Sequence, residues 1–203
     1  MKGKIIVFEG IDGAGTEVQS KLLLKFLKER ATPAVRLSYP DYETPIGKII
    51  YGFLHKKYDF DVPTQFLLHL ADWVKDKNKI KRLVAEGNVV ICDRYFTSTL
   101  AYQCMANGFP LEDALKIAKM FHLPKPDIVI YLKISPETSI KRKTNERGKR
   151  QLDRNESDKA LHERMVRAYD RLVDEQVWAS WFPVDGEKPI EEVAKRVRKI
   201  LRL

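Results

Sequence analysis

A glycine-rich loop near the start of the chain has the spacing of a phosphate-binding loop. Gly10, Gly13 and Gly15 directly follow the strand-like stretch IIVFE and open a stretch of helical periodicity. In that setting, backbone N–H groups of the loop converge on phosphate oxygens, and the dipole of the following helix adds to the attraction. Glycines also occur in ordinary tight turns, but the strand before, the helix after and the G-x4-G spacing favour a nucleotide site. We expect the phosphate contacts to come from Gly10, Ile11, Asp12, Gly13, Ala14, Gly15, Thr16, Glu17 and Val18.

The end of this loop departs from the usual pattern G-x4-G-K-[ST]. Thr16 stands where a Lys would reach the β and γ phosphates, and Glu17 stands where a hydroxyl would bind Mg²⁺. Losing one such donor typically costs about 3 to 4 kcal/mol of transition-state stabilisation, which weakens catalysis without abolishing it. A carboxylate is a good ligand for Mg²⁺. We therefore expect Glu17 to bind the metal and cations from another segment to replace the Lys; the alternative is a nucleotide site that has lost its chemistry.

A second motif, the sequence CDRY at 92–95, ends another apolar run. Asp93 is placed to hold a metal ion or a metal-bound water, and Arg94 offers a bidentate fork for a second phosphate. An Asp-Arg pair is also a common surface ion pair. Its position at a strand end, two strands on from the phosphate loop, favours the functional interpretation, so we expect Glu17 and Asp93 to form the metal site.

A third segment, residues 141–156, is dense in Lys and Arg and has almost no large apolar side chains. Such a segment cannot lie in a core. It is either a solvated helix end followed by a loop, or a basic lid that closes over phosphates and removes water from the reaction.

The elements that must position these motifs alternate along the chain. Apolar runs at 4–10, 34–40, 88–95 and 127–134, with a weaker one at 181–186, are continuous rather than alternating, which is typical of strands buried on both faces of a parallel sheet. Helical periodicity follows at 17–30, 63–86, 97–121, 136–146, 156–176 and 189–202. This pattern predicts an α/β domain of three layers, residues 1–203, with ligands bound outside the carboxyl ends of the strands.

Composition narrows the class of protein. A chain of 203 residues with 44% hydrophobic content fits one domain with a full core. Cys92 and Cys104 lie in apolar stretches, and neither they nor the histidines have the spacing of metal ligands. No apolar run has the length of a signal peptide or a membrane span. We expect a reduced, cytoplasmic protein without structural zinc and with no membrane partner.

The formal net charge of +9 indicates an anionic partner, which could be a nucleic acid, a membrane surface or a phosphorylated small molecule. A surface rich in Lys and Glu, as in thermophiles, would also account for much of it. Nucleic-acid binding predicts a basic stripe interleaved with aromatic side chains. Because the cations here gather in the single segment 141–156, we expect no nucleic-acid partner.

Several motifs, in order over nearly the whole chain, resemble the thymidylate kinase family. They are FEGIDGAG with Gln19, TPIGK at 44–48, LLHLADW at 67–73, DRYFTSTLAYQ at 93–103, and PDIVIYLKISPE at 126–137 with Arg142. The pattern DRYxxSxxAYQ is not generic among kinases. The resemblance implies the P-loop kinase fold of nucleoside monophosphate kinases with a five-stranded parallel sheet. It also implies a homodimer as the usual assembly, and phosphoryl transfer from ATP with Mg²⁺ to dTMP, giving dTDP and ADP.

The resemblance also implies roles for individual residues. Arg94 would bind the acceptor phosphate, Tyr95 the deoxyribose, Ser98 and Gln103 the thymine edge, and Arg142 would lie against adenine. The implied acceptor site is Asp12, Tyr42, Phe66, His69, Trp73, Arg94, Tyr95, Ser98, Tyr102 and Gln103. The implied catalytic groups are Asp12, Arg94 and the lid cations Arg147, Lys149, Arg150 and Arg154.

Three positions depart from the family's pattern. His69 stands where Phe usually stacks on thymine, Trp73 where Arg usually bonds it, and Tyr42 where an Arg often clamps the acceptor phosphate. Phe66, His69 and Trp73 share one helical face, which could equally be core. If that face meets the acceptor, base selectivity is relaxed or rebuilt. The sequence therefore leaves two hypotheses about function: an active kinase that prefers dTMP, and a nucleotide-binding protein of the same fold that turns over slowly.

Overall fold

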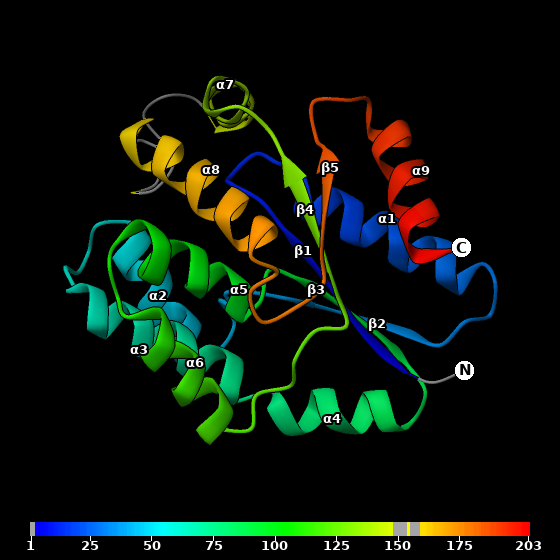
Figure 1. Cartoon of the computed structure of the whole chain (residues 1–203), viewed down its shortest axis with the longest axis horizontal. Coiled ribbons are helices and arrows are strands. Elements are labelled where there is room, and N and C mark those ends of the chain that lie inside the picture. Colours follow the sequence, from blue (N-terminus) through cyan, green and yellow to red (C-terminus); the bar gives the residue numbers. More distant parts are fainter. Residues whose placement is uncertain (1–2, 148–153, 155–158) are drawn as a thin grey trace.

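Five parallel strands form the centre of the structure, a computed structural model that describes residues 3–147, 154 and 159–203. The strands are β1 (Lys4–Glu9), β2 (Ala34–Ser38), β3 (Val89–Asp93), β4 (Ile128–Lys133) and β5 (Trp181–Asp185). They lie in the order β2-β3-β1-β4-β5 (Figure 1). Every residue of β3 is buried, as expected for an apolar strand covered on both faces. The predicted α/β fold and its five strands are confirmed.

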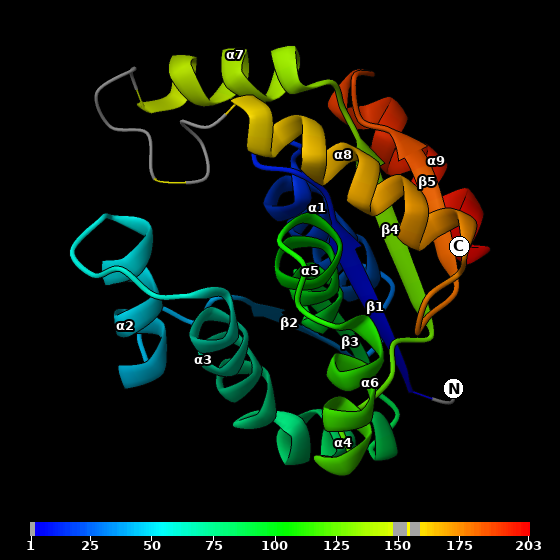
Figure 2. The same cartoon turned by 60° about the vertical axis from the view of Figure 1, so that its left-hand side comes forward.

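Helices cover both faces of this sheet. On one face lie α1 (Thr16–Lys28) and α9 (Ile190–Leu201), which contact each other (Figure 1). On the other face, α8 (Lys159–Asp174) packs against η1 (Leu100–Ala106), which continues α5 (Phe96–Thr99). The helix α7 (Pro136–Arg147) follows β4 and lies across the carboxyl-terminal end of the sheet (Figure 2). That end is therefore enclosed by helices as well as loops.

Three helical segments differ from the sequence prediction. The predicted helix 63–86 is two helices, α3 (Val62–Val74) and α4 (Lys77–Ala85), separated by a turn at Lys75 and Asp76, where Asp76 accepts a hydrogen bond from Tyr39. The predicted helix 97–121 breaks at Gly108, whose φ is 79°, so that α6 (Leu111–Met120) is separate. Between Leu100 and Ala106 the helix is a π-helix, a form that is frequent at functional sites.

A helix that the periodicity did not predict, α2 (Pro45–Leu54), begins in the motif TPIGK. Thr44 accepts a hydrogen bond from the backbone N–H of Gly47, and Pro45 occupies the first turn, so the start of the helix has both usual signals. Gly47 is needed there because a Cβ on it would overlap the carbonyl oxygen of Asp41. The helix is therefore held against the loop that follows β2.

The sheet places the motifs as the strand order requires. In a sheet of this kind ligands bind beyond the carboxyl ends of the strands, where the order reverses on either side of a central strand. Here that strand is β1, and the glycine loop follows it directly.

Cys92 and Cys104 are both buried and free. Within the described residues, no helix is both long and apolar enough to cross a membrane.

Candidate active site

The glycine loop forms one wall of a large cleft at the end of β1. Gly13 and Gly15 have φ values of 79° and 92°, which other residues rarely adopt, and α1 begins immediately after Gly15. Every residue from Asp12 to Val18 lines the cleft. Gly10 lies behind it, where a Cβ would approach the carbonyl oxygen of Leu132 to 2.8 Å. The loop thus presents backbone N–H groups and a helix N-terminus to an anion.

The helix α7 is fixed directly onto this loop. The hydroxyl of Ser139 donates to the carbonyl oxygen of Asp12, and the Arg142 guanidinium donates to the carbonyl oxygens of Gly13 at 3.1 Å and Gly186 at 2.9 Å. A Cβ on Gly13 would lie 3.2 Å from the carbonyl oxygen of Ser139. Arg142, expected against adenine, therefore lines the cleft while it ties the phosphate loop to the loop after β5.

Arg94 lies between the cleft and the core, with Asp12 as its main partner. Its guanidinium donates to Asp12 Oδ1 at 2.6 Å and to the carbonyl oxygen of Gly10 at 2.9 Å. Burial disfavours the charge of Arg94, but the combined attraction of Asp12, Tyr102, Tyr169 and Glu9 outweighs it and raises the pKa of Arg94 further. The backbone of Arg94 has a φ of 64°, so the residue is held in a strained conformation, which is common where a side chain must be aimed at a ligand.

A buried carboxylate that the sequence analysis did not single out, Glu9, holds Arg94 and its neighbours from below. Glu9 is fully buried and lies 4.0 Å from Arg94. It accepts hydrogen bonds from the backbone N–H of Tyr95 and the hydroxyls of Thr97, Ser98 and Tyr169 at 2.6 to 3.1 Å. Burial raises the pKa of Glu9, and Arg94 with the hydroxyl donors opposes that shift. Glu9 therefore connects β1, α5 and α8 beneath the site.

A second, smaller cavity lies beside the first. It is lined by Asp12, Pro40, Tyr42, Phe53, Leu54, Gln65, His69, Trp73, Arg94, Ser98, Thr99, Tyr102, Gln103 and Asn107. Of the ten residues expected at the acceptor, only Phe66 and Tyr95 do not line it. Both are fully buried: Phe66 stacks on Phe109, and Tyr95 stacks on Trp178. They support the cavity from behind.

The wall formed by Trp73 and Thr99 differs from what the sequence indicated. Trp73 is 1% exposed, and its indole N–H donates to the Thr99 hydroxyl at 3.0 Å, so its single donor is used inside the protein. Ser98 likewise donates its hydroxyl to Glu9. Thr99 had no signal in the sequence beyond its place in the motif. This helical face is therefore partly buried core, as at Phe66, and partly cavity lining, as at His69.

His69 lies in the same cavity and is neutral at physiological pH. Burial, with a smaller effect of Arg94, lowers its pKa to about 4 from 6.5. The unfolded chain takes up this proton near pH 6.5 and the folded protein only near pH 4, so acidification favours unfolding. We expect the free energy of unfolding to fall by about 2 kcal/mol more in the unmodified protein than in His69→Phe between pH 7 and pH 5.

Urea unfolding of both proteins at the two pH values measures this difference, and the comparison cancels the carboxylates that titrate over the same range. Equal losses in the two proteins would show that His69 is not held neutral by its surroundings.

The two expected metal ligands flank the phosphate loop in different ways. Glu17 is exposed, and its carboxylate lies 2.5 Å from the ammonium of Lys21, whose hydrogen bond lowers the pKa of Glu17. Asp93 pairs at 2.6 Å with Arg36, a residue that the sequence analysis did not identify. Among the described residues no group of three His, Cys, Asp or Glu side chains forms a metal cluster. Mg²⁺ is usually held by one or two carboxylates with substrate phosphates, and Glu17 and Asp93 fit that arrangement because both line the cleft.

Of the expected lid cations, only Arg154 has a described side chain; that of Arg147 and the whole of Lys149 and Arg150 lie outside the described residues. Arg154 is turned toward α2. Its guanidinium pairs with Asp59 at 2.6 Å, lies over the ring of Phe53, and donates to the carbonyl oxygen of Phe53. Arg154 therefore docks beside the smaller cavity, which Phe53 lines, and it is not among the residues that line the larger cleft.

Comparison with known proteins matches most of the chain to a family. The family profile described as thymidylate kinase matches residues 8–197. A thymidylate kinase of Plasmodium falciparum (isolate 3D7) is 33% identical over 203 residues, which cover 98% of this chain and 91% of that protein. One from Thermoanaerobacter sp. (strain X514) is 34% identical, covering 100% and 98%. The one from Homo sapiens is 32% identical, covering 97% and 89%.

Proposed function

Because the chain belongs to the thymidylate kinase family, we propose that it transfers the γ-phosphoryl group of ATP to dTMP, giving dTDP and ADP. The observation that carries this proposal is that the two cavities meet. Asp12, Pro40, Tyr42 and Arg94 line both of them. A donor phosphate on the glycine loop and an acceptor phosphate beside Arg94 would therefore come together at one point.

The reaction requires positioning and positive charge more than covalent help from the protein. An oxygen of the dTMP phosphate forms a bond to the γ-phosphorus, the bond from that phosphorus to the bridging oxygen breaks, and its electron pair stays on the β-phosphate of ADP. Arg94 orients the acceptor phosphate, and the loop amides hold the donor. Mg²⁺ held by Glu17 and Asp93 would supply charge neutralisation at the β and γ phosphates.

The acceptor cavity supports a preference for a neutral pyrimidine. Near neutral pH, His69 carries no charge and the Trp73 donor is already bonded to Thr99, so recognition of the base depends on cavity shape and on Thr99, Gln103 and Asn107. Shape alone distinguishes one methyl group by about 10- to 200-fold. We propose dTMP as the preferred acceptor, with dUMP, whose base lacks only this methyl group, discriminated by cavity shape.

We further propose one kinase domain over residues 1–203 that forms a homodimer in the cytoplasm. The family profile spans residues 8–197, which supports a single domain. Large apolar side chains are exposed on α2, at Ile49 and Tyr51, and on α3, at Leu67. Exposed apolar groups of this kind are typical of surfaces between subunits.

A coupled assay for ADP tests the proposed function. With ATP and Mg²⁺, we expect turnover with dTMP to exceed turnover with dUMP, dCMP, dAMP and dGMP. Absence of turnover with every acceptor, in a protein that is folded and binds ATP, would contradict the proposal and leave a nucleotide-binding protein.

A further inference from the structure

The phosphate loop lacks a long cationic side chain where one would contact the β and γ phosphates. Thr16 occupies that position; it is 8% exposed and begins α1. Its short neutral side chain cannot neutralise phosphate charge. A working kinase must therefore bring a cation to the same part of the cleft from another element.

The helix α7 lies directly against the loop. Ser139 and Arg142 on α7 bond the carbonyl oxygens of Asp12 and Gly13, and a Cβ on Gly13 would contact both Ser139 and Arg142. These contacts fix the helix in position and in rotation. The side chain that follows Arg142 is therefore also placed with respect to the loop.

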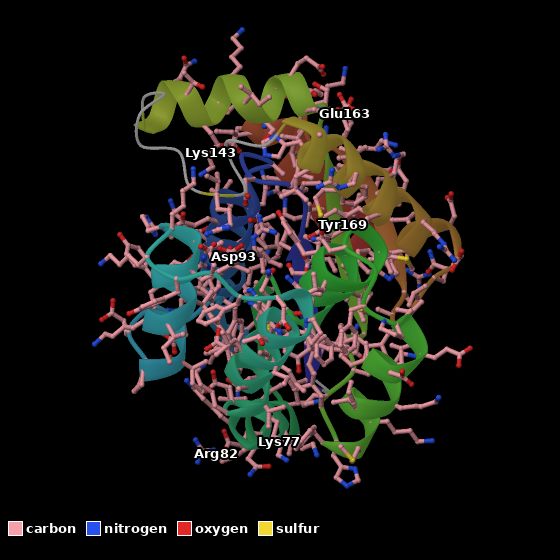
Figure 3. All side chains as sticks on the ribbon, turned by 90° about the vertical axis from the view of Figure 1, so that its left-hand side faces the viewer. Lys77, Arg82, Asp93, Lys143, Glu163 and Tyr169 are labelled. Atoms are coloured by element: carbon pink, nitrogen blue, oxygen red, sulfur yellow. The ribbon has the colours of Figure 1, made fainter. Side chains whose placement is uncertain are left out.

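That side chain is Lys143, which lines the cleft together with Gly15, Thr16 and Glu17. Figure 3 shows it on the side of α7 that faces the body of the molecule, above Asp93. Lys143 therefore shares this cleft with the first turn of α1, where the β and γ phosphates are expected.

The other cations that line this cleft in the described part of the chain have different positions. Arg94 is bound to Asp12 on the acceptor side, and Arg142 is bound to two backbone carbonyls. Lys188 lies on the loop after β5, 4.0 Å from Asp185. Arg36 is paired with Asp93 and does not line the cleft.

We propose that Lys143, one residue beyond the arginine that anchors α7, supplies the ammonium that the phosphate loop lacks at Thr16. The inference rests on the proposed function, because it assigns a charge to the donor half of that site. Lysine suits the task, since its flexible stem and three donors allow contact with oxygens of two phosphates. In this chain the cation would come from α7, which packs on the loop, rather than from the loop itself.

Isothermal titration with ATP and AMP, together with the coupled assay, tests the assignment in Lys143→Met and in its control Lys141→Met. Lys141 is an exposed cation on the same helix that does not line the cleft. We expect Lys143→Met to lower kcat by about a hundredfold and to weaken ATP binding while AMP binding is unchanged. Lys141→Met should leave all three quantities within about twofold of the unmodified protein.

A second variant separates a missing charge from a damaged helix. If Lys143 acts for the absent loop lysine, the double variant Thr16→Lys, Lys143→Met should have a kcat at least about tenfold higher than that of Lys143→Met alone. No recovery, equal effects of the two lysine variants, or an unchanged ratio of ATP to AMP affinity would each overturn the assignment. If dTMP is not phosphorylated but ATP affinity depends on Lys143, the proposed function fails while the assignment holds.

Discussion

Replacing Arg94 with Met is expected to lower kcat/KM for dTMP phosphorylation by at least about a thousandfold. Removal of one transition-state donor costs about 10²- to 10³-fold, and a phosphate that loses a bidentate partner loses binding as well. Arg94 is aimed at the junction of the two cavities by its bonds to Asp12 and Gly10. No other described cation lines both cavities.

The conservative variant Arg94→Lys distinguishes the guanidinium geometry from the charge. Lys keeps the positive charge beside Asp12 but cannot form the planar fork, so we expect its kcat/KM to lie between those of Arg94→Met and the unmodified enzyme. Steady-state kinetics over a range of dTMP concentrations measures both variants, and circular dichroism checks that each is folded. Activity of Arg94→Met within tenfold of the unmodified enzyme would remove Arg94 from the acceptor site.

The sheet and the phosphate loop could be predicted because each depends on local pattern. Continuous Val and Ile runs identify strands buried on both faces, and a strand followed by G-x4-G and a helix identifies a phosphate loop. The breaks at Lys75–Asp76 and at Gly108 were missed because the helical period continues through them. At the first break Asp76 bonds Tyr39, 37 residues away in sequence, and no local pattern carries that information.

The site could be predicted in outline but not in its bonds. The motif DRYFTSTLAYQ predicts that Arg94 and Tyr102, eight positions apart, lie in the acceptor cavity. It does not show that Trp73 donates to Thr99 or that Ser98 donates to Glu9. Those pairings join α3, α5 and β1, and they exist only once the helices have packed on the sheet. Lys143 was passed over for the same reason, since its position depends on how Ser139 and Arg142 fix α7.

Glu9 is the clearest case of a buried group whose hydrogen-bond partners cannot be identified from the sequence. Glu9 stands at the end of an apolar strand and is fully buried, so its carboxylate oxygens meet hydrogen-bond donors of the protein rather than water. Its Oε1 accepts from the Tyr95 N–H and the Thr97 hydroxyl, and its Oε2 accepts from Ser98 and Tyr169. A buried carboxylate is tolerated only when its oxygens are satisfied in this way.

We therefore expect Glu9→Gln to lower the free energy of unfolding by about 3 to 5 kcal/mol, a loss typical of breaking a buried charged network. Gln keeps the shape, but its NH₂ group would face donors where an oxygen now accepts, and Arg94 would lose a buried negative charge 4.0 Å away. Denaturant unfolding measures the change. Tyr169→Phe, which removes one donor and leaves the charge, should cost only about 1 kcal/mol. Equal losses in the two variants would mean that the hydrogen bond from Tyr169, rather than the carboxylate charge, stabilises the floor of the site.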